Sequence, residues 1–192
     1  YDVTAAASRD PILAVGQRPS AASLYVDHTV RSRRLVARAG VRGETVTGTG
    51  WSGVSPRLSL KWFANPNLAL TIAGGGTTQW TPALRNEQAP VRIFDFWLTA
   101  DRNTPVARAW QGSAGGEQWF GGTRFVRLEG WVKRYNNLPS SNLFNDPDVL
   151  GDEFIVTTGQ SYGADLLLRQ LESERVSGWI AYSYAVNWRD GA

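Results

Sequence analysis

Hydrophobic and polar residues alternate at every second position through several long segments of this chain. The clearest segment is 176–188, where one set of alternate side chains is large and apolar and the other, apart from Trp179, is small or polar. The first set is Ile180, Tyr182, Tyr184, Val186 and Trp188; the second is Trp179, Ala181, Ser183, Ala185 and Asn187. Successive Cβ atoms point to opposite faces only in a β-strand. A strand this long, with one apolar aromatic face, is typical of a strand between lipid and a polar lumen.

The same alternation recurs along the chain and predicts an all-β protein. Residues 1–21 contain Pro11, Gly16 and Pro19 and are expected to form a loop. The strands are expected within 22–188, at about 22–30, 34–45, 55–64, 68–78, 106–118, 122–135, 158–170 and 176–188. No helical periodicity of useful length is present. The pattern therefore predicts an antiparallel, up-and-down transmembrane β-barrel segment of about eight strands.

The predicted connections alternate between tight turns and longer loops. Short turns are expected at 31–33, 65–67, 120–122 and 172–175, and loops at 46–54, 79–105 and 136–157. Tight turns force consecutive strands to pair in an antiparallel manner. We expect one sheet in sequence order, curved but not closed, with long loops on one side and tight turns on the other.

The two faces of this sheet differ in chemistry. The convex, lipid-facing side is expected to carry Leu35, Ala37, Leu58, Leu60, Leu68, Leu70, Ile72, Val126, Leu128, Leu166, Leu168, Ile180 and Tyr182. The lumen-facing side is expected to carry Arg38, Lys61, Arg127, Glu129, Lys133, Asp165 and Arg169. An Arg or Lys at the bilayer midplane costs about 2–4 kcal/mol on the lipid face and little in a wet lumen.

The composition of the chain excludes several other classes of protein. The chain has 192 residues with no Cys, so a disulfide scaffold and a thiolate metal site are excluded. No apolar run approaches the ~20 residues that a transmembrane helix needs. The net charge is only +3, with both signs interspersed, which gives no nucleic-acid footprint.

Several segments resemble the late barrel strands of TonB-dependent outer-membrane receptors. These are 159–169 followed by 176–185, the stretch 123–138, the hairpin 55–70, and the loop 84–98 that precedes the strand pair. The resemblance covers about residues 22–192. It implies a 22-strand barrel in the bacterial cell outer membrane. The resemblance further implies a nutrient importer rather than an enzyme.

Such a receptor would import a scarce nutrient, which could be a metal chelate, cobalamin or a glycan. The implied partners are outer-membrane lipid, a plug domain, the TonB energy-coupling system, and a small-molecule or oligosaccharide ligand. No counterpart of the plug or of the C-terminal aromatic end strand is expected in this chain, which suggests an internal fragment. Two alternatives remain open: a complete eight-stranded outer-membrane barrel with a structural or adhesive role, and a soluble glycan-binding β-domain.

Three motifs suggest chemistry that we do not expect here. The glycines of 48–53 match a dinucleotide-binding pattern, but another strand follows them instead of a helix. His28, the only histidine, adjoins Asp27, and neighbours on a strand point to opposite faces. The acidic stretch 145–153 lacks the regular spacing of a calcium loop. We expect no catalytic residue, no cofactor and no metal.

Aromatic residues in the two long loops are the candidate ligand contacts. They are Phe94, Phe96, Trp97, Phe144 and Phe154. Exposed aromatic clusters often mark recognition surfaces, and long loops on a rigid scaffold often carry binding residues. Packing of the loops against one another is an equally good explanation.

Overall fold

The computed structural model describes residues 20–47, 50–81, 83–84, 96–97, 99–100, 105–142, 154–171 and 176–190. Within them the chain forms one eight-stranded antiparallel sheet and a two-stranded sheet. The large sheet consists of β1 (Ala21–Arg31), β2 (Leu35–Val46), β3 (Trp51–Asn65), β4 (Leu68–Gln79), β7 (Ala107–Phe120), β8 (Arg124–Ser141), β9 (Phe154–Gln170) and β10 (Gly178–Asp190). The small sheet pairs β5 (Ala83–Leu84) with β6 (Phe96–Trp97). The described residues contain no helix that is long and apolar enough to span a membrane.

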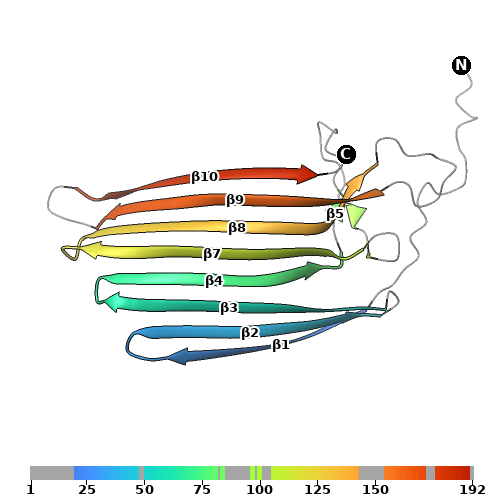
Figure 1. Ribbon diagram of the computed structural model, residues 1–192, viewed down its shortest axis with the longest axis horizontal. Helices are drawn as coiled ribbons and strands as arrows, with labels where there is room; N and C mark the ends of the chain where they lie inside the picture. The colour runs from blue at the N-terminus through green and yellow to red at the C-terminus, as the bar shows by residue number, and fades with distance from the viewer. Residues whose placement is uncertain are drawn as a thin grey trace, which may run out of the picture.

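The strands of the large sheet lie side by side in sequence order, as Figure 1 shows. Each pairs antiparallel with its neighbours, and β1 and β10 form the two edges. The predicted all-β, up-and-down and unclosed sheet is therefore confirmed. In a complete eight-stranded barrel, β1 would pair with β10, and this pairing does not occur in the described part of the chain. A sandwich needs a second large sheet packed on the first, and the described residues form none.

Three strands are longer than the sequence predicts. Trp51 already pairs with Val46, so most of the expected loop 46–54 is a continuation of the β2–β3 hairpin. The expected loop 136–157 is also shortened, because β8 continues to Ser141 and β9 begins at Phe154. An irregularity between Tyr135 and Leu138 interrupts the β8–β9 register there. The sequence prediction was wrong at these places because Gly, Asn and Pro residues were taken as loop signals, whereas cross-strand hydrogen bonds continue past them.

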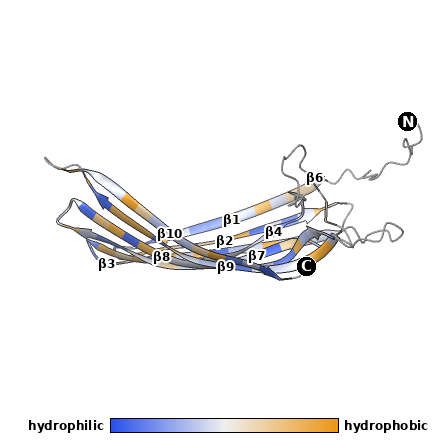
Figure 2. Cartoon of the chain, turned by 90° about the horizontal axis from the view of Figure 1, so that it is seen from above, coloured by the Kyte–Doolittle hydropathy of each residue, from blue (hydrophilic) through white to orange (hydrophobic). Residues whose placement is uncertain are grey.

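The sheet is bent into a trough, which is evident when it is viewed from above (Figure 2). It has almost no packed core: the described buried hydrophobic residues are Val46, Ala69, Ala100, Val106 and Ala107. The long apolar side chains are instead exposed, including Leu58, Ile72, Leu128 and Ile180 at 53–68%. A single layer with its large apolar residues on the surface indicates that something other than protein core covers that face.

Candidate functional site on the concave face

The convex face carries a continuous apolar band. Residues that pair directly across neighbouring strands share a face. Four rows across the sheet are obtained when the pairing is followed from strand to strand, starting at Tyr162, Ala164, Leu166 and Leu168 on β9. Within the described residues, these rows contain no Asp, Glu, Lys or Arg. All the residues predicted for the convex face lie there.

Charged and aromatic residues border this band. The described charged residues of the convex face are Arg124 at the tight-turn end and Arg108, Arg134 and Asp190 at the opposite end. Exposed aromatic residues include Trp62 toward the tight turns and Trp110, Tyr162 and Trp188 toward the other end. The rings of Tyr162 and Trp188 meet edge to face at 5.3 Å. An apolar band between aromatic girdles is the pattern of a lipid-facing barrel wall.

The concave face has the opposite composition. The structure places Arg38, Lys61, Arg127, Glu129, Lys133, Asp165 and Arg169 on this face, because their registers alternate with those of the convex band. A hollow of about 530 Å³ lies along it and is lined by residues from β1 to β9. Residues this far apart along the sheet share one hollow because the sheet curves toward them. That this face lines a lumen stays a prediction.

Ion pairs join several of the concave charges. Arg38 reaches Asp27 on β1 at 3.4 Å, and Arg127 reaches Glu129 on its own strand at 2.6 Å. Lys61 on β3 bonds Glu117 on β7, so this pair crosses the intervening strand β4. Alanine and threonine on β4 leave room for that crossing: Lys61 pairs with Thr71, and Ala69 pairs with Glu117. Each pair is partly exposed and contributes about 1 kcal/mol or less.

Another ion pair between two residues of the same strand lies on the concave face, toward the end of the sheet opposite the tight turns. Arg42 contacts Glu44 at 2.6 Å, and the hydroxyl of Thr78 donates to Glu44 at 3.2 Å. The Ser55 and Thr78 hydroxyls are 3.3 Å apart. These contacts join β2, β3 and β4 by side chains in addition to the backbone ladder.

One aromatic residue belongs to the hollow. The indole N–H of Trp131 donates to a carboxylate oxygen of Asp165 at 2.9 Å, and the Lys133 ammonium lies 5.3 Å from the indole centre. A Cβ on Gly163 would lie 2.6 Å from the Trp131 ring, so the ring lies directly against that glycine. The hollow thus combines an aromatic surface, a carboxylate and an ammonium group.

Arg57 is a functional candidate that the sequence reasoning missed. It lies on β3 and lines the same hollow as Lys133 and Asp165. The four ion pairs found among the described residues include neither Arg57 nor Lys133. The sequence pattern already places Arg57 on the same face as Lys61, because the two residues are separated by an even number of positions along one strand.

The structure describes two of the three motifs that were set aside. Asp27 contacts Arg38 on the concave face, whereas His28 pairs in register with Ala39 of the convex face. Gly53 lies within β3 rather than at the start of a helix. No group of three or more His, Cys, Asp or Glu residues that could hold a metal lies within the described ranges. The acidic stretch 145–153 lies outside them.

The aromatic loop candidates are only partly located. Phe94 and Phe144 lie outside the described residues. Phe96 and Trp97 form β6, where Trp97 pairs with Ala83, and Phe154 begins β9. The positions of these three side chains are not described. Their role in ligand contact therefore stays a prediction.

Comparison with known proteins gives a structural match but no match by sequence. No protein-family model matches the chain, and no curated protein matches it. The siderophore receptor PirA from Pseudomonas aeruginosa superposes with a TM-score of 0.68 at 15% identity, covering 88% of this chain and 34% of that one. The FrpB iron transporter from Neisseria meningitidis (F3-3 variant) superposes with a TM-score of 0.66 at 13% identity, covering 89% of this chain and 26% of that one.

The match concerns the fold of part of a receptor barrel. The chain spans about a third and a quarter of the lengths of the two solved structures. The resemblance to TonB-dependent receptors predicted from the sequence is confirmed at the level of the fold. The two solved proteins are described as a siderophore receptor and an iron transporter, and the likeness of this chain to them is one of fold.

Proposed function

We propose that this chain forms part of the barrel wall of a TonB-dependent transporter in a bacterial outer membrane. The observation that carries the proposal is the arrangement of the faces: an apolar band on the convex side and ion pairs around a hollow on the concave side. A soluble protein would bury its leucines, whereas a membrane barrel exposes them to lipid and keeps its charges in a wet interior.

The imported nutrient is proposed to be a metal chelate rather than cobalamin or a glycan. The two solved structures that share this fold are described as a siderophore receptor and an iron transporter. The hollow is lined by Arg57 and Lys133, which are outside the ion pairs of the described residues, and the Lys133 ammonium lies beside the Trp131 ring. Cations and an aromatic surface suit an anionic chelate with unsaturated groups.

In the intact protein, the other implied partners are a plug domain and the TonB energy-coupling system. The connections 80–106 and 142–153, with the adjoining ends of β8 and β9, are proposed to face the cell exterior, with Phe94, Phe96, Trp97, Phe144 and Phe154 helping to capture the ligand. Long loops on a rigid scaffold are common sites of recognition, which supports this placement.

The proposal is tested by uptake in living cells. A strain lacking the intact protein should lose uptake of a radiolabelled ferric chelate, and the restored gene should recover it. Dissipation of the proton-motive force should abolish uptake in the restored strain. Labelled cobalamin and labelled oligosaccharides serve as the competing nutrients. Loss of uptake for one of these, with iron uptake unchanged, would contradict the metal-chelate assignment; unchanged uptake of all three would contradict the transporter.

The role of the loops needs a separate experiment. Deletion of residues 86–100 from the intact protein should weaken ligand binding to whole cells, because it removes Phe94, Phe96 and Trp97. Surface display, measured with an antibody to another external loop, is the control. Unchanged affinity with normal display would leave these loops structural, and the binding residues would then be sought on the lumen wall.

A further inference from the structure

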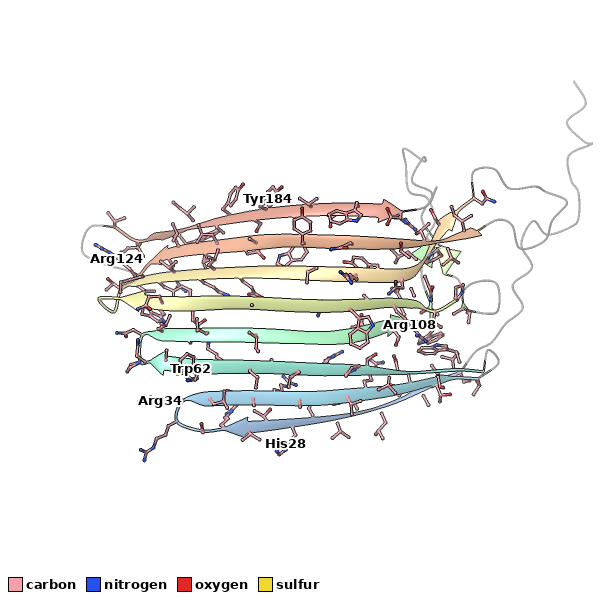
Figure 3. The ribbon with its side chains drawn as sticks, in the orientation of Figure 1. His28, Arg34, Trp62, Arg108, Arg124 and Tyr184 are labelled. Carbon is pink, nitrogen blue, oxygen red and sulfur yellow. The ribbon has the colours of Figure 1, made fainter. Side chains whose placement is uncertain are left out.

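We propose that the hairpin tip between β1 and β2 binds the phosphate of an anionic phospholipid headgroup. The tip carries Arg31, Arg33 and Arg34, and Arg124 is a further cation at the same end of the sheet (Figure 3). This inference rests on the proposed function, because a lipid headgroup meets the tip only if the barrel spans a membrane.

The residues at this tip are not those usually found in a tight hairpin turn. The backbone N–H of Ser32 donates to the carbonyl of Leu35 at 2.8 Å, which leaves Arg33 and Arg34 as a two-residue loop. Such loops favour residues that adopt positive φ, mainly Gly, Asn and Asp. Among the described non-glycine residues, only Asn137 has a positive φ, so neither arginine adopts the preferred conformation.

The other described tips use residues that tight turns favour, although the β3–β4 turn also has no residue with positive φ. The β7–β8 turn uses Gly121 and Gly122 at φ values of 57° and 76°. The β3–β4 turn uses Pro66 between two asparagines, and the side chain of Asn65 accepts from the Asn67 N–H at 2.8 Å. The two arginines of the β1–β2 tip therefore do not serve the turn itself. Residues that a tight turn does not favour, present in it without a benefit to the fold, indicate a functional constraint.

No described acidic residue forms an ion pair with the arginines of the tip. Arg31, Arg33 and Arg34 are all exposed, and none of them belongs to the ion pairs found in the described ranges. The described residues of the tight turns include no Asp or Glu. The carboxylate of Asp27, farther along β1, already contacts Arg38. A guanidinium presents a planar set of donors that matches two oxygens of a phosphate.

The tip also adjoins the apolar band. The Phe63 N–H donates to the carbonyl of Arg34 at 2.8 Å, which holds the tip against β3. The preceding residue of β3, Trp62, pairs with Leu35 on the convex face, and these side chains are 47% and 39% exposed. Figure 3 shows Trp62 toward the same end of the sheet as Arg34.

A phospholipid fits this combination better than a protein partner does. Tryptophan favours the level of the headgroups, so acyl chains beside Leu35 and Trp62 would bring the lipid phosphate to the tip. Basic clusters at this level recognise anionic headgroups. A partner protein would need no such continuity between the cations and the apolar band.

The test uses the intact protein that contains this chain, purified in mild detergent. Native mass spectrometry measures retention of added phosphatidylglycerol, with phosphatidylethanolamine and inorganic phosphate as the other probes. The test variant is Arg33→Gln/Arg34→Gln. The matched control is Arg108→Gln/Arg134→Gln, which removes two convex arginines at the opposite end of the sheet. We expect the tip variant to bind phosphatidylglycerol about 25-fold more weakly, from about five-fold per arginine, and the control to bind it normally.

Several outcomes would overturn the site. Equal weakening by the two variants would show a general charge effect, and no weakening would show that the tip binds no lipid. Full displacement of the lipid by millimolar inorganic phosphate would point to a free-phosphate site. A tip variant that keeps lipid but loses a protein from an envelope extract would point to a protein partner. Insertion of the unmodified protein into vesicles is measured in parallel, because failure of insertion would contradict the proposed membrane function and not the tip alone.

Discussion

Two consecutive leucines on β9 provide a direct test of which face meets lipid. Leu166 pairs with Leu128 in the apolar band, whereas Leu167 pairs with Arg127 on the concave face. Both leucines are half-buried, so loss of leucine packing affects the two substitutions similarly. Leu166→Arg should lower the free energy of unfolding by about 2–4 kcal/mol, because it places a guanidinium near the bilayer midplane. That loss corresponds to a change of about 30- to 700-fold in the ratio of folded to unfolded protein.

Leu167→Arg is the control. It adds a cation beside Arg127, but the carboxylates of Glu129 and Asp165 share that face, and we expect a change below about 1 kcal/mol. The measurement is guanidinium unfolding of the intact protein in lipid vesicles, followed by tryptophan emission, with correct insertion checked by protease protection. Equal losses for the two variants, or a larger loss for Leu167→Arg, would refute the assignment of the faces and the membrane proposal with it.

Three further predictions concern the concave wall. A double-mutant cycle of Lys61→Ala and Glu117→Ala should give a coupling energy of about 0.5–1 kcal/mol that falls as salt is added, and no coupling would mean that the pair across β4 does not form in solution. Gly115→Ala should lower the unfolding free energy by about 1–3 kcal/mol, because the added Cβ would lie 2.6 Å from a β8 carbonyl oxygen. The control is Gly112→Ala on the same strand, where the added Cβ meets nothing nearer than 3.9 Å. Equal denaturation midpoints for the two variants would contradict this prediction. Trp131→Phe removes the indole donor from its carboxylate partner and should cost about 1–2 kcal/mol in the same denaturant titration, and an unchanged midpoint would show that water replaces the indole without loss.

The sequence alone determined which side chains share a face. The alternation of Leu58, Leu60 and Trp62 with Arg57, Ser59 and Lys61 needs no tertiary information, because a strand has a period of two wherever it lies. The up-and-down order was also predictable, since turns as short as 65–67 leave a strand no partner but its neighbour. These features come from local geometry.

The ends of the strands could not be predicted in the same way. Trp51 extends β3 because Val46 lies opposite it, and Ser141 extends β8 because Phe154 lies opposite it. Backbone hydrogen bonds to the neighbouring strand override the loop preference of glycine and asparagine, and a residue's own loop or strand preference does not show how far this pairing continues. Two of the five aromatic loop candidates, Phe94 and Phe144, lie outside the described residues, and ligand contact by any of the five remains a prediction.

The arrangement of the concave wall was decided by the tertiary structure. Lys61 meets Glu117 across β4, and Trp131 meets Asp165 from an adjacent strand. Neither contact follows from spacing along the chain, because each depends on the register and on the curvature of the sheet. The same curvature brings Arg57 into one hollow with Lys133. Alternation assigns a residue to a face, whereas register and bending decide which residues on that face meet.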